Sequence, residues 1–567
     1  MHTDLIHTGS GGKVLVDSLI THGVRQVFCV PGESYLDILN ALYDVREQIA
    51  LRVCRHESGA SNMAEAYGKL TGAPGIVMVT RGPGATNAAI GIHTAYQDST
   101  PLIMFIGQVA RDCMDREAFQ EIDYRRMFGQ MTKWVAQIDD ARRIPEYLSR
   151  AFHTAVAGRP GPVVLALPED MLRDQVSARA APQFQRVAAA PTPAALQQLS
   201  GLLAQAKRPL AILGGSGWTS QACADLRRFA EAWQLPVACA FRFQDLFDNT
   251  HALYAGDVGI GINPKLAQRV KNADLVLAIG PRLGEMTTSG YSLFDIPVPK
   301  QQLVHIHAGA EELGSVYAST LPINSGMPEF AAAVADLVSV STPVASPAWQ
   351  DEAATAHADY LTWSTPPQVD GPVQMGEIML YLRDHLPADA IICNGAGNYA
   401  TWVHRFHRFR HFKSQLAPTS GAMGYGVPAA IAAKSLYLER TVVAFAGDGC
   451  FMMSSSELAT AMQYQLPVIF IVVNNGIYGT IRMHQEREYP ARVHGTTLTN
   501  PDFAAFARSF GAFGAVVEKT ADFMPAFEQA RASGLPAVIE IRLSPEVITP
   551  TLTLSSIRAQ AQQNAQK

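Results

Sequence analysis

Several features are scarce or missing in this chain of 567 residues, and each absence narrows its function. The seven cysteines are widely spaced and form no CxxC pair, which favours reduced thiols over disulfides. No apolar run reaches the ~18 residues of a membrane helix, and residues 1–13 lack the apolar core of a signal peptide. Lys and Arg form no basic block and the net charge is −5, so neither nucleic acid nor a membrane is expected as a partner. These absences predict a cytoplasmic protein.

Length and pattern predict an α/β protein of three domains. The composition, 48% hydrophobic and 17% charged, is globular, and the chain is too long for one core. Strand-like apolar runs alternate with helical segments, which is typical of doubly wound parallel sheets. We expect an N-terminal domain at residues 1–174, a central domain at 190–341 and a C-terminal domain at 370–550. A polar tail at residues 551–567 is expected to be frayed or to form a lid. Linkers rich in Ala or Pro are expected at residues 175–193 and 341–372.

One stretch of the C-terminal domain carries a strand, a crossover helix and a second strand. Apolar runs at residues 441–446 and 468–473 predict the strands, and a capping-box spacing at residues 454–457 marks the helix start. Because parallel strands end at the same edge of a sheet, Asp448 and Asn475 should lie side by side where such sheets hold ligands. A carboxylate and an amide oxygen suit Mg²⁺, which takes its other ligands from water and a phosphate. Either loop alone is also an ordinary turn sequence.

Taken together, the two loops resemble the cofactor-binding signature of thiamine diphosphate enzymes, which begins Gly-Asp-Gly and ends Asn-Asn. The resemblance implies that Asp448, the Asn475 side chain and the Ile477 carbonyl bind Mg²⁺, which bridges to the diphosphate. Met423 matches the apolar side chain over which these enzymes bend the cofactor. Gly421 matches the residue whose carbonyl accepts a hydrogen bond from the exocyclic amine of the cofactor. The other residues expected at the cofactor are Gly397, Asn398, Gly447, Gly449 and Cys450.

The N-terminal domain resembles acetolactate synthases more specifically. Residues 55–68 match their pyrimidine-binding motif, and further matches follow at residues 82–87, 94–101, 118–121 and 158–163. The resemblance makes Glu57 the acid that exchanges a proton with the cofactor's pyrimidine ring, which a carboxyl of raised pKa in an apolar pocket does well. It makes Gln120 an active-site residue that reaches toward the substrate. The alternative for Glu57 is a surface residue favoured by the dipole of a helix over residues 58–70.

The central domain departs from this family. Acetolactate synthases carry a flavin there that does no redox chemistry, but residues 280–286 lack the expected acidic run and residues 305–308 replace an acidic repeat with histidines. The Gly-rich turn at residues 214–217 is weak evidence for a nucleotide by itself. We therefore favour a central domain without FAD, and bound FAD is the less favoured alternative.

The cofactor makes a 2-oxo acid the expected donor. The leading hypothesis is decarboxylation followed by carboligation to a second carbonyl compound, an aldehyde or another oxo acid; the alternatives are a simple decarboxylase that releases an aldehyde, and an aldehyde or 2-hydroxyacyl-CoA lyase. A binding protein that has lost its chemistry is opposed by Glu57, Asp448 and Asn475.

Two positions leave the balance between these reactions open. Glu33 stands where acetolactate synthases have Gly and where pyruvate and indolepyruvate decarboxylases have an acid, although residues 111–114 lack the paired histidines of those decarboxylases. His484 replaces a Trp that selects the acceptor, and it is expected to line the substrate pocket with Thr480 and Ile481. In this family the site lies between two subunits, so we expect a homodimer or a dimer of dimers (a homotetramer).

Overall fold

The computed structural model describes residues 5–340 and 347–565. It contains three parallel sheets of six strands each and one antiparallel pair of strands, which confirms the predicted fold class. The chain forms two compact units: the described part of Met1–Val187 together with Ile431–Leu436, and Ala188–Ala430 together with the described part of Tyr437–Lys567. The domain limits expected from the sequence stay predictions.

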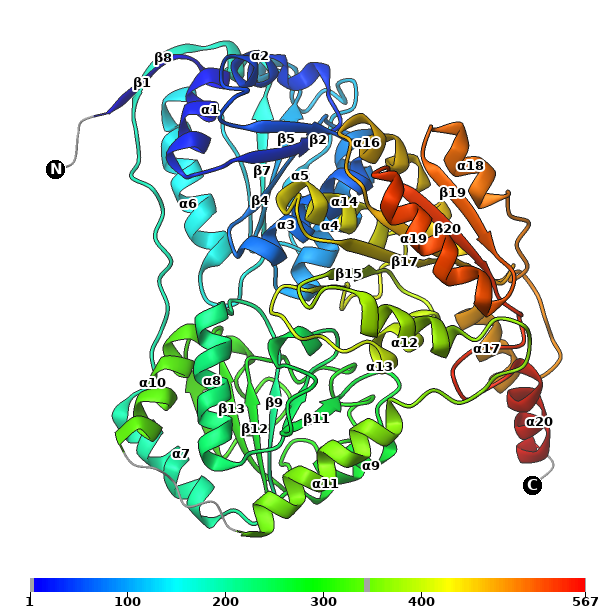
Figure 1. Cartoon of the computed structure of the whole chain (residues 1–567). Coiled ribbons are helices and arrows are strands. Elements are labelled where there is room, and N and C mark those ends of the chain that lie inside the picture. Colours follow the sequence, from blue (N-terminus) through cyan, green and yellow to red (C-terminus); the bar gives the residue numbers. More distant parts are fainter. Residues whose placement is uncertain (1–4, 341–346, 566–567) are drawn as a thin grey trace. The chain divides into compact units, whose positions relative to one another are not determined.

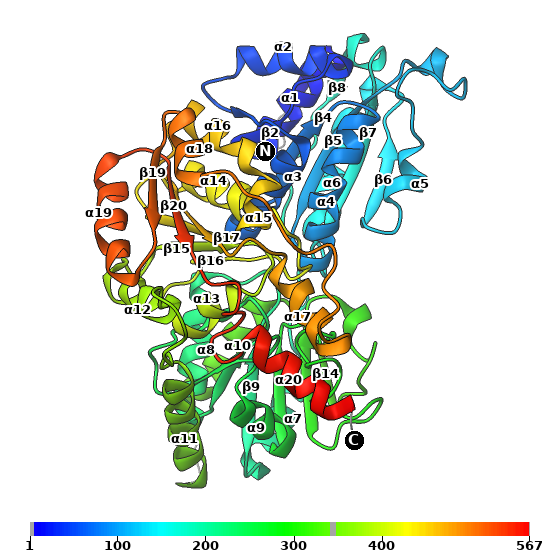
Figure 2. The ribbon, with the colours of Figure 1, turned by 90° about the vertical axis from the view of Figure 1, so that its right-hand side faces the viewer.

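The first unit contains a sheet of order β3-β2-β4-β5-β7-β6 (Figure 1). Its strands are β2 (Gln26–Cys29), β3 (Ala50–Val53), β4 (Gly75–Val79), β5 (Leu102–Gln108), β6 (Trp134–Gln137) and β7 (Pro162–Pro168). The larger helices are α1 (Gly11–Thr21), α2 (Leu36–Asp44), α3 (Glu57–Thr71), α4 (Pro83–Asp98) and α6 (Ile144–Val156), with α5 (Tyr124–Phe128) between β5 and β6. The sheet is wound on both faces: α1, α2 and α6 pack on one buried cluster, and α3 packs against α4 (Figure 2).

The central sheet has the order β11-β10-β9-β12-β13-β14. Its strands are β9 (Pro209–Leu213), β10 (Val237–Cys239), β11 (Tyr254–Asp257), β12 (Leu275–Ile279), β13 (Gln302–His307) and β14 (Leu321–Asn324). One face packs against α7 (Pro193–Gln205), α8 (Ser220–Trp233) and α10 (Met327–Val340), and the other against α9 (Pro264–Asn272). The strands are buried runs of apolar residues, as expected of a parallel sheet covered on both faces.

The third sheet has the order β16-β15-β17-β18-β20-β19. Its strands are β15 (Ile391–Asn394), β16 (Gln415–Leu416), β17 (Val442–Gly447), β18 (Ile469–Asn474), β19 (Phe513–Val517) and β20 (Ala537–Arg542). Its helices are α12 (Met375–His385), α13 (Ala400–Phe406), α14 (Gly426–Leu436), α15 (Asp448–Met452), α16 (Leu458–Gln463), α17 (Gly479–Glu488), α18 (Phe503–Ser509), α19 (Phe523–Ser533) and α20 (Leu554–Ala565). Strands β17 and β18 are neighbours and parallel, as predicted.

Both expected linkers contain regular structure. The first contains β8 (Gln175–Arg179), which pairs antiparallel with β1 (Ile6–Ser10). The second was wrong over much of its length, because α11 (Pro347–Trp363) lies within it; residues 341–346 lie outside the described part of the chain. Four side chains of α11 at helical spacing are buried in the central domain, which stabilises a helix despite the neighbouring prolines: Trp349, Ala353, Ala356 and Tyr360.

Two local predictions also need correction. The helix between β17 and β18 does not start at a capping box: α15 begins at Asp448, and the Ser454 hydroxyl makes no capping hydrogen bond to the 3₁₀ turn Ser455–Glu457. The polar tail is not frayed over its described residues but forms α20, which packs against α17 (Figures 1 and 2). Within the described ranges, no helix has the length and apolar character needed to cross a membrane.

Candidate active site

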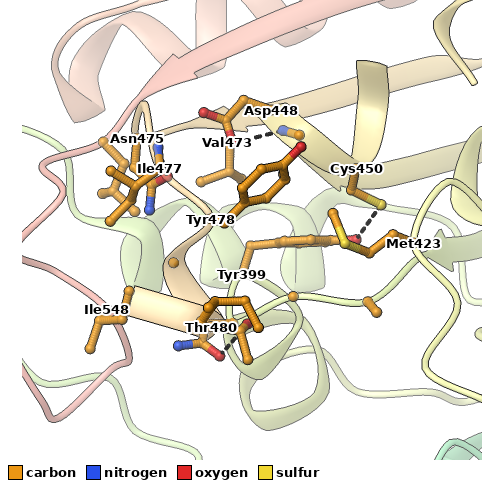
Figure 3. A pocket seen from close by; sticks show the side chains of 18 of the residues that line it. Tyr399, Met423, Asp448, Cys450, Val473, Asn475, Ile477, Tyr478, Thr480 and Ile548 are labelled. Atoms are coloured by element: carbon orange, nitrogen blue, oxygen red, sulfur yellow. Dashed lines mark hydrogen bonds between the residues drawn. The ribbon is translucent and has the colours of Figure 1, made fainter. Parts of the chain in front are cut away.

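A cavity of about 270 Å³ lies in the second unit, at the edge where β15, β17 and β18 end (Figure 3). Nearly every residue that the sequence assigned to the cofactor or pocket in this part of the chain lines it. These residues are Gly397, Asn398, Gly421, Met423, Gly447, Asp448, Gly449, Cys450, Asn475, Ile477, Thr480 and Ile481. The structure thus brings together loops that are far apart in sequence.

The Asp448 carboxylate stands at the centre of the two signature loops. It is 2% exposed; Oδ1 accepts a hydrogen bond from the Gly449 N–H at 2.9 Å, and Oδ2 accepts one from the Gly476 N–H at 2.9 Å. The second bond joins the end of β17 to the loop after β18, so the two loops meet as predicted. Burial raises the pKa of Asp448, because desolvation penalises the charged carboxylate. A cation beside this carboxylate would offset that penalty.

Sequence reasoning missed the residue that orients Asp448. Asn500 donates from Nδ2 to Asp448 Oδ2 at 2.7 Å and to Asn474 Oδ1 at 2.9 Å. Asn474 in turn donates to Oε1 of the buried Glu540 at 2.8 Å. No motif marks Asn500, which lies in the loop before α18, so only the packing of that loop against β18 reveals its role.

The oxygen donors fit Mg²⁺. Besides the single carboxylate of Asp448 they are the Asn475 side chain, whose Oδ1 accepts from the Ile477 N–H at 3.3 Å, and the Ile477 carbonyl. The bridge hydrogen bonds around Ile477 use the Tyr478 N–H and the Gly476 carbonyl, which leaves the Ile477 carbonyl outside the ladder. The described residues contain no group of three or more His, Cys, Asp or Glu side chains that could hold a metal ion by themselves, so a cation here would complete its shell from water and a phosphate.

Gly449 is required at the turn that would face that phosphate. An ideal Cβ on Gly449 would lie 2.5 Å from Cε1 of Tyr478, well inside contact distance. Any larger residue would push the Tyr478 ring away from the loop (Figure 3). The glycine therefore lets the loop after β17 and the loop after β18 approach each other closely.

Cys450 and Tyr399 join three of the loops that line the cavity. The Tyr399 hydroxyl accepts from the Gly395 N–H at 3.0 Å and donates to Cys450 Sγ at 3.6 Å, and Sγ also accepts from the Gly424 N–H at 3.1 Å (Figure 3). Burial raises the pKa of the Cys450 thiol. Cys450 thus serves as a neutral packing and hydrogen-bonding group that fixes the loop carrying the half-buried Met423.

Of the three residues expected in the substrate pocket, Thr480 and Ile481 line this cavity and His484 does not. Thr480 donates to Asn398 Oδ1 at 2.9 Å, which joins the start of α17 to the loop after β15, and Ile481 is 56% exposed at the cavity. His484 lies further along α17 at an exposed position, outside the residues that line this cavity, and its place in the substrate pocket stays a prediction. The residues of α17 that line the cavity, Gly479, Thr480 and Ile481, all belong to its first turn, and His484 lies one turn later.

The segment before the C-terminal helix forms one side of the cavity, and the helix packs behind it. Ile548 lines the cavity and packs with Leu554 and Ile557 against Ile477 and Met483. The helix is also held by charge: Arg558 donates to both oxygens of the buried Glu486 on α17, at 2.7 and 2.6 Å. The tail expected to be frayed or a lid is therefore docked on the helix that follows the Asp448–Asn475 site.

Arg558→Ala should lower the free energy of unfolding by about 1–2 kcal/mol at neutral pH, because Glu486 loses two charge-assisted hydrogen bonds and keeps those from Arg482 and the Ala491 N–H. The Arg558 hydrogen bonds are the first cause that lowers the pKa of Glu486 to about 2. The stabilisation is therefore complete above the usual pKa of 4.5 and is lost as pH falls toward 2. Denaturant unfolding at several pH values tests this, with Arg531→Ala at an exposed ion pair as the control. A difference independent of pH would contradict it.

In the first unit, the predicted catalytic residues surround the turn after β4. Glu57 begins α3, is half-buried, and its Oε2 accepts from Asn87 Nδ2 at 3.0 Å. Gly82 has φ +49°, and an ideal Cβ there would lie 2.8 Å from the Gln120 carbonyl oxygen. Gln120 itself has φ +65°, an unfavourable conformation for a residue with a side chain. The loop that holds Gln120 is thus fixed against a turn that only glycine fits.

Glu33 has a carboxylate that is exposed within the first unit and pairs with an arginine. Its side chain is 66% exposed and its Oε1 accepts from Arg81 Nη2 at 3.3 Å. Arg81 is buried and also donates to Glu169 at 3.0 Å and to the Phe119 carbonyl at 3.2 Å. Within the first unit, Glu33 is therefore one of two carboxylates that share the Arg81 guanidinium.

The segment that begins at Gly280 packs against both the Gly-rich turn at residues 214–217 and His305 of β13. An ideal Cβ on Gly215 would lie 2.0 Å from the Gly280 carbonyl oxygen, so the Gly-rich turn serves close packing of two backbones. His305 is buried and its Nε2 lies 3.0 Å from the Pro281 carbonyl oxygen, a hydrogen bond that requires Nε2–H. Burial lowers the pKa of His305 to about 4, so the ring is neutral at pH 7.

Comparisons with known proteins cover all three sheets. Family models described as the thiamine pyrophosphate enzyme N-terminal TPP binding domain, central domain and C-terminal TPP binding domain match residues 9–127, 196–334 and 395–541. The acetolactate synthase large subunit of Parasynechococcus marenigrum is 31% identical over 550 residues, 94% of this chain and 88% of the relative. The acetolactate synthase isozyme 3 large subunit of Escherichia coli is 31% identical over 547 residues, 93% of each chain.

Proposed function

Because this chain belongs to the thiamine pyrophosphate enzyme family, with acetolactate synthase large subunits among its relatives, we propose that it decarboxylates a 2-oxo acid and joins the product to a second carbonyl compound. The observation that carries this proposal is the cavity where Asp448, Asn475 and Met423 meet. Thiamine diphosphate is the cofactor, and Mg²⁺ is proposed as the ion that joins its diphosphate to Asp448, Asn475 and the Ile477 carbonyl. When bound, the cofactor would supply the electron sink for the pair that stays on the former carbonyl carbon as CO₂ leaves.

The chain's own residues would divide the remaining tasks. Asn500 holds the Asp448 carboxylate toward the cation, and Gly449 lets the two metal loops approach each other. Met423 supports the bent cofactor from the loop that Cys450 fixes. Glu57 exchanges a proton with the pyrimidine ring, and Gln120 contacts the substrate.

The experiment that tests this function is product analysis. Apoprotein is loaded with thiamine diphosphate and Mg²⁺ and incubated with a panel of 2-oxo acids, each with and without an aldehyde or a second oxo acid. The proposal expects CO₂ together with a carboligated product. Aldehyde alone under every condition would instead establish a simple decarboxylase, and no turnover of any 2-oxo acid would refute both.

Glu33→Gln should shift products from free aldehyde toward carboligation when an acceptor is supplied, if Glu33 delivers the proton that releases the aldehyde. The expected change in the product ratio is several-fold, with a smaller effect on donor consumption. Chromatography at matched donor consumption measures it. The control is Glu169→Gln, which removes the other carboxylate on Arg81. If both variants change the ratio equally, Glu33 acts only through Arg81; if neither does, the acid role is wrong.

Three further properties are part of the proposal. The functional assembly is a homodimer or a dimer of dimers, because Glu57 and the Asp448 site must act on one cofactor and relatives of this class place them on different subunits. The central domain holds no FAD, since residues 280–286 and 305–308 lack the acidic pattern expected of the flavin-binding family; visible absorbance of the purified protein tests this. A reducing compartment, the cytoplasm, suits the seven free cysteines.

A further inference from the structure

Arg242 of the central domain reaches into the cofactor-binding part of the third sheet. It follows β10, its side chain is 8% exposed, and its backbone has φ +65°. Residues other than glycine adopt this conformation only where the surrounding structure compensates for it, and such positions concentrate at functional sites. With this backbone conformation, the buried Arg242 guanidinium extends from the central domain to the loops of the third sheet.

The Arg242 guanidinium binds the backbone of two cofactor loops. Nη1 donates to the Pro418 carbonyl, and Nη2 donates to the Gly395 carbonyl at 3.3 Å. Gly395 opens the loop that carries Gly397 and Asn398, and Pro418 precedes the loop that carries Gly421 and Met423. One planar group with several N–H donors thus spans the loop for the diphosphate and the loop for the pyrimidine ring.

Neighbouring residues anchor the segment from which Arg242 extends. The Gln244 N–H donates to Gln415 Oε1 at 2.7 Å, and Asp245 Oδ2 accepts from the Ser414 N–H at 3.1 Å. The Asn249 N–H donates to the Phe409 carbonyl at 2.8 Å. These bonds fix the segment on β16 and the turn before it, so the guanidinium approaches its two carbonyls from a rigid base.

The charge of Arg242 acts on the cavity wall. Burial raises the pKa of Tyr399 and of Cys450, and the positive charge of Arg242 opposes that rise at both side chains. Tyr399 and Cys450 line the cavity. A fixed cation behind this wall favours an anion in front of it, because the protein interior screens the charge weakly.

We propose that Arg242 is a positioning residue that holds the diphosphate loop and the pyrimidine loop in their binding geometry from the central domain. The inference rests on the proposed cofactor and extends it: the central domain contributes to binding thiamine diphosphate through one side chain that touches the loops and not the ligand. Hydrogen bonds from a charged donor to two carbonyls are strong, so their loss should lower the affinity for thiamine diphosphate.

The test is calorimetric titration of apoprotein with thiamine diphosphate at saturating Mg²⁺. Arg242→Met should weaken binding by about 10- to 100-fold. Arg242→Lys should recover part of the affinity, because it keeps the charge but loses the fork that spans two carbonyls. Arg269→Met is the control: it removes another mostly buried arginine of the central domain, which donates to Asp359 Oδ2 at 3.0 Å away from the cofactor loops, and it should leave affinity unchanged.

A second readout separates positioning from general stability. Hydrogen exchange should rise in Arg242→Met at residues 395–399 and 418–424, whereas Arg269→Met should raise it around Asp359. Equal affinity of Arg242→Met and wild type would overturn the inference, and so would an equal loss in Arg269→Met. If Arg242→Met does not fold, wild-type affinity in Arg242→Lys overturns it. If the wild type does not bind thiamine diphosphate, the proposed function is refuted. Hydrogen exchange at residues 395–399 and 418–424, compared between wild type and Arg242→Met, then tests by itself whether Arg242 holds the two loops.

Discussion

Asp448→Asn should abolish Mg²⁺-dependent binding of thiamine diphosphate, with an affinity loss of about 10³-fold or more. The substitution keeps the shape of the side chain but removes the only carboxylate of the donor set, and a neutral amide does not hold a divalent cation against water. The amide oxygen of the variant can still accept on one side, from Gly449 or from Gly476 and Asn500, while its NH2 group faces the donors on the other side. The contact between the two loops should therefore be weakened but not lost. Calorimetric titration of the cofactor, with and without Mg²⁺, measures the effect.

Two controls make this result specific. Asp502→Asn changes a neighbouring aspartate that only caps α18 through the Ala505 N–H, and Asn caps helices as well as Asp does. It should bind the cofactor like wild type. Thermal unfolding of apo Asp448→Asn should remain cooperative and lie near wild type, because the neutral amide avoids the desolvation penalty of the buried carboxylate but leaves at least one donor without an acceptor. Undiminished, Mg²⁺-dependent affinity in Asp448→Asn would exclude the proposed metal site.

Glu57→Gln should reduce turnover by about 10²-fold or more while most of the cofactor affinity remains, because only proton exchange at the pyrimidine ring is removed. Gln can still accept the hydrogen bond from Asn87 that Glu57 receives at the start of α3. Steady-state turnover and cofactor titration on the same preparations separate the two effects. Glu47→Gln, at an exposed position of the same unit, is the control and should be silent.

Mixing the two variants extends the Glu57 prediction to the assembly. If Glu57 and Asp448 of different subunits form one site, co-incubated Glu57→Gln and Asp448→Asn proteins should regain part of the activity once subunits exchange. Mixed dimers then contain one site with both wild-type residues. Absence of recovery, with exchange shown by labelled subunits, would place both residues of each site on one chain. Wild-type turnover in Glu57→Gln would return that residue to a role at the helix start.

The sequence determined those parts of this protein that depend on local pattern. Buried apolar runs predicted β17 and β18, and the residues just after each run predicted Asp448 and Asn475, because parallel strands place their ends at one edge. The same logic failed where local signals conflicted with burial. The prolines around α11 indicated a linker, but Trp349 and Tyr360 gain enough from burial in the central domain to stabilise a helix there.

Only the tertiary structure identified the residues that support the site from a distance. Asn500 contacts Asp448 across 52 positions of sequence, and Arg242 contacts Gly395 across 153. Neither lies in a motif, since a single hydrogen-bonding side chain can be supplied by any loop that packing brings near. Likewise the exposure of Glu33 and its pairing with Arg81 follow from how two strand ends meet. Strand order and periodicity are written in neighbouring residues, whereas these contacts exist only after distant segments have packed together.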